Sequence, residues 1–286
     1  MNEIELTGGT IRYRDTGDGP PIVFIHGLLV DGTLWRKVVP KLEDRFRCLV
    51  PDLPLGSHTL PMRPNADLTP PGLARTIGEF LEKLDLQDVT LVANDTGGAL
   101  TQILLASGEH NDRIARVVLT PCDAFDNFFP PMFRPLQALA HVPGAVYPVI
   151  QTLRAPALRN LPLAYGWLSK HRVPDDVSAG WVRACQTDKG VRKDTAKVLV
   201  GVSSRYTNEA AEKLPGFDRP VLLVWAPEDK FFPMTDARRL AELFPDARIE
   251  EVADSYTFVP EDQPELLARL VGEFAAAPAK RATAAS

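Results

Sequence analysis

The stretch from Val89 to Leu100 constrains the fold of this chain more than any other part of the sequence. An apolar run (VTLVA) is followed by small and polar residues (NDTGG) and then by an apolar helical pattern. A strand joined to a helix by so short a turn needs small neighbours, because the turn is strained and pushes one side chain outward. Here that side chain is the carboxylate of Asp95. On this segment alone, a simple turn former or a helix N-cap remains the alternative.

Apolar strands and helical patterns alternate on both sides of this turn. Strands are predicted at 21–25, 46–50, 89–93 and 115–120, and, after a long interruption, at 219–225 and 247–252. Helices are predicted at 34–42, 71–84, from the turn to about 107, 235–243 and 264–274. Strands that are apolar throughout and alternate with helices imply an α/β fold, with a mostly parallel central sheet and helices on both faces.

The alternation is interrupted between residues 123 and 214. This stretch is rich in proline and aromatic residues, and its pattern predicts short helices. We therefore expect a core formed by residues 1–122 and 215–274. An inserted helical cap, residues 123–214, would cover the carboxyl edge of the sheet, where open parallel sheets place their sites. The Ala-rich end, residues 275–286, is expected to be disordered, since it has no apolar face to bury.

Composition argues against several classes of function. The chain has 286 residues, 45% of them hydrophobic, and a net charge of -5 without any block of like charge. Neither a nucleic acid nor a membrane is therefore expected as a partner. Three widely spaced cysteines, Cys48, Cys122 and Cys185, indicate reduced thiols in a cytoplasmic protein. No nucleotide, flavin or metal motif is present, so we expect no cofactor and no metal. A monomer and a homodimer are both compatible with the sequence.

Other loops that follow predicted strands would meet the turn around Asp95. One follows the strand at 21–25 and contains Leu28, whose backbone N–H, with that of Thr96, is a candidate donor to a developing negative charge. Asp229, after the strand at 219–225, is a candidate for the acid that orients a catalytic base, with an ordinary turn aspartate as the alternative. Asp123 is a second candidate for this acid, and a helix N-cap is the alternative for it.

These segments together resemble the α/β-hydrolase superfamily, in the branch that contains epoxide hydrolases and haloalkane dehalogenases. The resemblance covers about residues 10–274 and is carried by HGLLVDGTLWRKVVP, VPDLP, LVANDTGGAL, VLLVWAPEDKFFP and VADSYTFVPEDQPE. It implies an α/β-hydrolase fold with an inserted cap, and an enzyme in which Asp95 attacks an electrophilic carbon and forms an ester. The nearest activity it implies is that of an epoxide hydrolase acting on a neutral hydrophobic small molecule.

One departure from the family pattern bears on the chemistry. The family usually carries a catalytic histidine about seven residues before the Pro-Glu that opens the last helix, and this chain has Thr257 there. A hydroxyl is no base at pH 7, so hydrolysis of the ester should slow by about 10²–10⁴-fold. Dehalogenases of this branch also tend to carry Trp and Asn halide donors at the positions of Thr96 and Leu28, so the sequence favours epoxides over halides.

Four outcomes remain open for a chain without that histidine. Another histidine can replace it, and His58 is the best placed, although a surface or structural role is the alternative for it. Asp95 and Asp229 can instead support non-hydrolytic chemistry, such as isomerisation, cyclisation, elimination or carbon–carbon bond formation, if the pKa of one is raised. The protein can also stop after alkylating itself at Asp95. Finally, it can be a catalytically silent ligand-binding protein.

Apolar and aromatic residues predict the class of substrate. We expect the substrate pocket to be lined by Leu29, Phe125, Phe128, Phe129, Trp167 and Phe258, with Trp35 as a further candidate site residue. A place in the hydrophobic core is the alternative for the aromatic residues. Epoxide hydrolases usually place cap tyrosines over the epoxide oxygen, so the resemblance makes Tyr147 and Tyr165 candidates for this contact, with a buried structural role as the alternative for each. Such a pocket favours a small hydrophobic substrate without charge.

Overall fold

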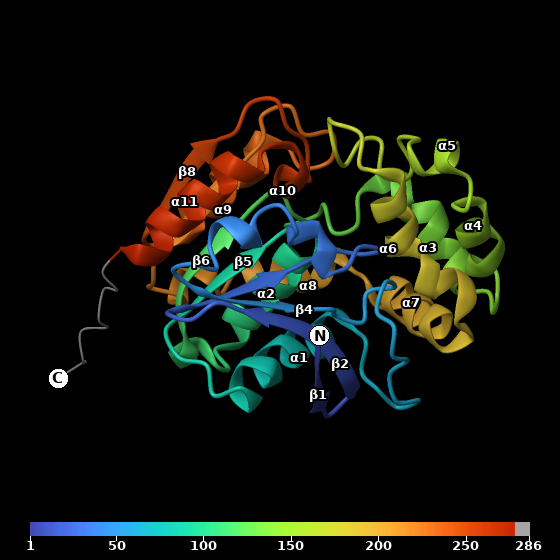
Figure 1. Ribbon diagram of the computed structural model, residues 1–286, viewed down its shortest axis with the longest axis horizontal. Helices are drawn as coiled ribbons and strands as arrows, with labels where there is room; N and C mark the ends of the chain where they lie inside the picture. Colours follow the sequence, from blue (N-terminus) through green and yellow to red (C-terminus); the bar gives the residue numbers. More distant parts are fainter. Residues whose placement is uncertain (278–286) are drawn as a thin grey trace.

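The computed structural model, which describes residues 1–277, is built around one eight-stranded sheet (Figure 1). The strands are β1 (Asn2–Leu6), β2 (Gly9–Thr16), β3 (Pro21–Ile25), β4 (Arg47–Pro51), β5 (Val89–Ala93), β6 (Ile114–Leu119), β7 (Val221–Trp225) and β8 (Ala247–Glu251). Their order is β1-β2-β4-β3-β5-β6-β7-β8. The pairs from β4 to β8 are parallel, whereas β2 pairs antiparallel with both β1 and β4. The predicted α/β class with a mostly parallel sheet is confirmed, and β1 and β2 add a hairpin that was not predicted.

The central strands are buried on both faces of the sheet. Every residue of β5, β6 and β7 is buried, which explains why these segments are mostly apolar, with Thr90 and Arg116 as exceptions. One face packs against α1 (Pro70–Lys83), α2 (Thr96–Ser107) and α9 (Met234–Leu243). The other packs against α11 (Pro264–Ala276) and two short 3₁₀ helices, η1 (Gly32–Trp35) and η2 (Val39–Lys41). The remaining short elements are η3 (Asn111–Arg113), η4 (Pro131–Phe133), η5 (Leu214–Gly216) and α10 (Val259–Asp262).

A group of helices lies at one end of the sheet, as Figure 1 shows. It consists of α3 (Arg134–Ala140), α4 (Val146–Thr152), α5 (Pro156–Arg159), α6 (Asp175–Thr187) and α7 (Lys189–Gly201), and we call it the lid. The next helix, α8 (Ser204–Ala211), packs against α2 of the core. We therefore end the lid before Ser204, whereas the sequence predicts a cap that extends to residue 214.

The helix predicted at 34–42 is replaced by the two short helices η1 and η2. Pro40 explains this difference, because a proline inside a helix removes a backbone donor and clashes with the preceding turn. The sequence placed the helical pattern correctly but overestimated its continuity.

The last helix extends further than its sequence pattern predicts. α11 runs to Ala276, and Arg116 donates hydrogen bonds of 2.7 Å to the carbonyl oxygens of Ala275 and Ala277. The predicted disordered tail is therefore wrong at its first residues, which a buried arginine holds in place. The rest of that prediction, residues 278–286, lies outside the described part of the chain. Among residues 1–277, no helix combines the length and apolar character needed to cross a membrane.

Candidate active site

Asp95 lies at the sharp turn between β5 and α2. Its backbone has φ of 54° and ψ of -133°, a left-handed region that residues with a side chain rarely adopt. Close packing around the turn requires small residues, since a Cβ at Gly98 would lie 2.3 Å from the Cβ of Cys122. The turn directs the half-buried Asp95 side chain into a cavity beneath the lid.

Two backbone N–H groups, those of Leu28 and Thr96, hydrogen-bond the carboxylate of Asp95. The sequence predicts these two N–H groups as donors to a developing negative charge, and the structure places both of them on the carboxylate of Asp95. The approach is close because Gly27 has no side chain: a Cβ there would lie 2.0 Å from Oδ2 of Asp95. Burial nevertheless raises the pKa of Asp95 to about 6, and the two hydrogen bonds only partly offset this effect. The carboxyl group can therefore gain or lose a proton near neutral pH.

Asp229 and Thr257 meet at the carboxyl end of the sheet. Oδ1 of Asp229 accepts hydrogen bonds of 2.7 Å from the backbone N–H groups of Phe231 and Phe232. Oδ2 accepts a hydrogen bond of 2.8 Å from the hydroxyl of the fully buried Thr257. Burial raises the pKa of Asp229 to about 7, and the negative charge of Asp95 contributes a smaller increase. The threonine thus occupies the position from which a histidine would contact this acid.

Asp123 is a buried carboxyl group close to Asp95. It is fully inaccessible to solvent, and within residues 1–277 neither of its carboxyl oxygens has a hydrogen-bond partner. Burial and the negative charge of Asp95 raise its pKa well above the usual range, and the nearby hydroxyl of Thr96 offsets only a small part of this increase. No helix begins at Asp123, so the N-cap alternative is excluded.

The cavity beside Asp95 has a volume of about 110 Å³ and is roofed by the lid. Leu29 and Phe129, both predicted in the pocket, lie in its lining. Within residues 1–277, the polar side chains of this lining are Asp95 and Tyr165 alone. The Tyr165 hydroxyl donates a hydrogen bond of 2.6 Å to the carbonyl oxygen of Leu29. An isolated carboxyl group and a phenol therefore share an otherwise apolar chamber.

Four aromatic residues predicted in the pocket lie outside this lining. Phe125 is 2% exposed and packs beneath the guanidinium of Arg239, and Phe128 belongs to the core. Phe258 is fully buried among other rings, and Trp167 is 37% exposed at the surface. These predictions are corrected because three of the side chains pack in the core and the fourth lies at the surface. No sequence pattern distinguishes either place from a pocket.

Two further candidates are also placed elsewhere. Trp35 is fully buried and packs against Phe24, with ring centroids 5.2 Å apart, so it is a core residue. His58 is buried, with Nε2 3.3 Å from a carboxylate oxygen of Asp194 and Nδ1 accepting from the N–H of Gly56. Its side chain is engaged by the lid helix α7 and does not line the cavity. His58 therefore does not replace the absent catalytic histidine.

Part of the cavity wall is not predicted by the sequence. Phe231 and Phe232 lie in the lining, directly after the candidate acid Asp229. On the opposite side, α3 and α4 contribute Leu136 and Ile150, together with Phe133 just before α3. The double phenylalanine beside Asp229 was a usable signal, because residues next to a catalytic loop reach the same sheet edge. The spacing of Phe133 and Leu136, three residues apart, was another, since such residues share one helix face.

The chain resembles known proteins over most of its length. Residues 20–264 match the family described as alpha/beta hydrolase fold. Haloalkane dehalogenase 2 of Mycobacterium tuberculosis is 29% identical over 271 residues, covering 93% of this chain and 91% of that protein. A putative ancestral haloalkane dehalogenase superposes with a TM-score of 0.77 at 22% identity, covering 96% of this chain and 98% of that one. An alpha/beta hydrolase fold protein from Burkholderia ambifaria superposes with a TM-score of 0.78 at 21% identity, covering 95% of this chain and 97% of that one.

Proposed function

The chain belongs to the alpha/beta hydrolase fold family, and on this premise we propose that it is a hydrolase-like enzyme whose Asp95 attacks a small, uncharged epoxide. The observation that carries the proposal is the placement of the Asp95 carboxyl in a chamber whose other lining side chains are apolar, apart from Tyr165. An apolar wall selects a substrate without charge, and the carboxylate is the nucleophile.

The size of the chamber limits the substrate. Its volume of about 110 Å³ lies well below the roughly 300 Å³ at the low end for ligand pockets. Short alkyl epoxides therefore fit better than polycyclic molecules. The aromatic walls formed by Phe129, Phe231 and Phe232 suit an alkyl or phenyl substituent.

In the first step, a carboxylate oxygen of Asp95 attacks a ring carbon of the epoxide. The ring carbon–oxygen bond breaks, its electron pair passes to the epoxide oxygen, and this oxygen takes the proton of the Tyr165 phenol. Burial raises the pKa of Tyr165, so the phenol stays protonated through the neutral range. The product is a hydroxyalkyl ester of Asp95, whose carbonyl oxygen would accept the N–H groups of Leu28 and Thr96, and the phenolate regains a proton from water.

The second step, hydrolysis of this ester, lacks its usual base. Among residues 1–277, no histidine lines the cavity. Thr257 is buried, and its hydroxyl donates a hydrogen bond to Asp229. The carboxylate of Asp229 is itself only a weak base. We therefore expect the ester to form faster than it is hydrolysed and to accumulate on the protein.

Epoxides are favoured over haloalkanes by the available donors. A leaving halide needs N–H groups that stabilise its charge, and the side chains of Leu28 and Thr96 carry none. Their backbone N–H groups already bind Asp95. Within the described residues, the cavity lining contains no Trp, Asn or Gln side chain that could take this role. An epoxide oxygen stays attached to the product and can take a proton from Tyr165 instead.

The test is to incubate the protein with 1,2-epoxybutane in ¹⁸O-labelled water and to analyse it by mass spectrometry. We expect the mass of one epoxide to be added to the peptide containing Asp95, with ¹⁸O entering this carboxylate as the ester is slowly hydrolysed. Asp95→Asn should abolish the adduct, while Asp44→Asn, which changes an exposed carboxylate, should leave it unchanged. An adduct of equal amount in Asp95→Asn would refute nucleophilic attack by Asp95.

A non-hydrolytic activity is the second candidate. It is favoured by the raised pKa values of Asp95, about 6, and Asp229, about 7, which allow either carboxyl to carry a proton near neutral pH. In this case Asp95 would act as an acid or base, and the epoxide would rearrange without forming an ester. A product with the mass of the substrate, formed with neither an adduct nor a diol, would identify this chemistry.

A further inference from the structure

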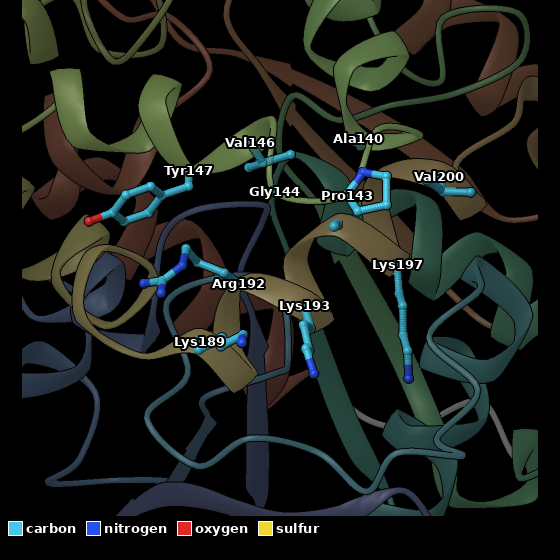
Figure 2. A pocket seen from close by; sticks show the side chains of 11 residues that line it. Ala140, Pro143, Gly144, Val146, Tyr147, Lys189, Arg192, Lys193, Lys197 and Val200 are labelled. Atoms are coloured by element: carbon cyan, nitrogen blue, oxygen red, sulfur yellow. The ribbon is translucent and has the colours of Figure 1, made fainter.

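A second hollow, separate from the cavity at Asp95, lies on the outer surface of the lid. It has a volume of about 640 Å³ and lies between α7 and the segment that joins α3 to α4 (Figure 2). None of the residues that line it also lines the chamber of Asp95. We call it the lid groove.

Two parallel rows of side chains from α7 form one wall of the lid groove. Lys189, Lys193 and Lys197 follow one another at intervals of four residues, which places them on one face of the helix. Arg192, Ala196 and Val200 form the neighbouring row with the same spacing. The helix therefore presents a cationic row beside a partly apolar one.

The opposite wall is apolar. Ala140, Pro143 and Val146 line it, and Figure 2 shows Pro143 and Val146 across the groove from the line of lysines. Apolar side chains remain open to solvent here, since Tyr147 is 45% and Val200 41% exposed. Exposed apolar side chains that lie together in a hollow are typical of a binding site.

The charge of the groove is not neutralised by the protein. Within residues 1–277, no ion pair involves the three lysines or Arg192, and no carboxylate lines the groove. Lys197 donates to the carbonyl oxygen of Pro64, and Arg192 lies over the ring of Tyr147. The acidic residues of α7 and its N-cap bind backbone N–H groups and do not pair with these cations. Asp188 caps the helix, and Asp194 is buried against the N–H of Met62.

We propose that the lid groove binds a single-chain alkyl carboxylate, with its alkyl chain along Pro143 and Val200 and its carboxylate beside Lys193 and Lys197. Charge complementarity requires an anion, and the apolar wall requires an alkyl chain joined to it. The concave shape favours one chain held inside the groove over a flat bilayer surface. A nucleic acid is a poor fit, because the wall facing the lysines is apolar and offers no further cation.

The lid groove can be tested independently of Asp95 chemistry. α3 and α4 contribute Leu136 and Ile150 to the lining of the chamber, and Ala140 and Val146 to the lining of the groove. A ligand of the groove therefore contacts helices that also line the chamber. Its binding is measured as a heat of binding, and it does not depend on any reaction at Asp95.

The experiment is isothermal titration of the protein with sodium decanoate below its micelle concentration. We expect binding at one site, and binding weakened roughly tenfold or more in the combined variant Lys189→Ser, Lys193→Ser and Lys197→Ser, because three positive charges are lost. A matched variant with the same charge change elsewhere, Lys83→Ser, Lys213→Ser and Arg238→Ser, should bind as the wild type does. Decyltrimethylammonium, with the same chain and the opposite charge, should not bind. Far-UV circular dichroism checks that both variants are folded.

Several outcomes would overturn the proposal. They are the absence of decanoate binding to the wild type, equal affinity in the lysine variant, and equal loss of affinity in the matched variant. A further arm uses vesicles of phosphatidylglycerol and of phosphatidylcholine. Binding to phosphatidylglycerol vesicles without binding to monomeric decanoate would reject the single-chain ligand and assign the groove to an anionic membrane surface.

Discussion

The hydroxyl of Thr257 donates a hydrogen bond of 2.8 Å to Oδ2 of Asp229. The other oxygen of this carboxylate is held by two backbone N–H groups, so the acid is oriented from both sides by the protein. In the related family this acid orients a histidine that activates water. Here it holds a threonine, whose hydroxyl supplies no base. Under the proposed function, the site would therefore have a nucleophile in Asp95 and lack the group that regenerates it.

Replacing Thr257 with histidine should restore the second half of the reaction. An imidazole at this position would contact Asp229 and activate water, and we expect the ester at Asp95 to be hydrolysed about 10²–10⁴-fold faster. The measurement is the loss of the adduct mass with time after free epoxide is removed. Thr257→Val is the matched control, because it removes the hydroxyl without adding a base. Equal rates of adduct loss in the two variants would contradict this account of the site.

The rate of alkylation should depend on pH through the ionisation of Asp95. Because the pKa of this carboxyl is about 6, the nucleophilic carboxylate is a minor form at pH 5 and the main form at pH 7. We expect the initial rate of adduct formation to rise about tenfold for each pH unit below 6 and to level off above it. Intact-protein mass spectrometry after short incubations measures this rate. A rate that stays constant from pH 5 to 8 would show that ionisation of Asp95 does not limit the reaction.

Asp95→Asn should stabilise the protein at high pH. The pKa of Asp95 is raised from about 3.9 in an unfolded chain to about 6 in the fold. Between these values the folded state binds more protons than the unfolded state, so the free energy of unfolding falls as pH rises through this window. The asparagine side chain of the variant does not ionise and so avoids this loss. We expect its free energy of unfolding to exceed that of the wild type by about 1–3 kcal/mol at pH 8 and to change little at pH 4. Urea denaturation at the two pH values measures it, with Asp44→Asn as the exposed control. A gain of equal size at both pH values would point to a cause other than ionisation.

Gly27→Ala should disable the site. The new Cβ would lie 2.0 Å from Oδ2 of Asp95, so the carboxylate has to leave the N–H groups that hold it. Because the loss of one such donor costs about 10²–10³-fold, we expect adduct formation to slow by at least that factor. Gly180→Ala is the control, since nothing lies within 4 Å of a Cβ at that helical position. Normal alkylation by Gly27→Ala would show that this close contact is unimportant.

Local sequence patterns predicted the framework of the site. β5 is found at the predicted residues, and α2 begins at Thr96 directly after Asp95, as expected. These predictions succeeded because an apolar strand, a turn of small residues and an apolar helix are each encoded by neighbouring residues. The roles of Leu28 and Thr96 as backbone donors followed from the same local logic, since each adjoins a strand end.

The sequence by itself therefore determined the six strands from β3 to β8, the main helices between them and the identity of the residue at the turn. Only the tertiary structure decided which aromatic side chains face the chamber, since Phe125 and Phe231 are both aromatic residues beside a strand end and only Phe231 lines it. It likewise assigned His58 to Asp194, across 136 residues of chain. Periodicity records which face of an element is apolar, whereas the neighbour that covers this face depends on packing between distant segments.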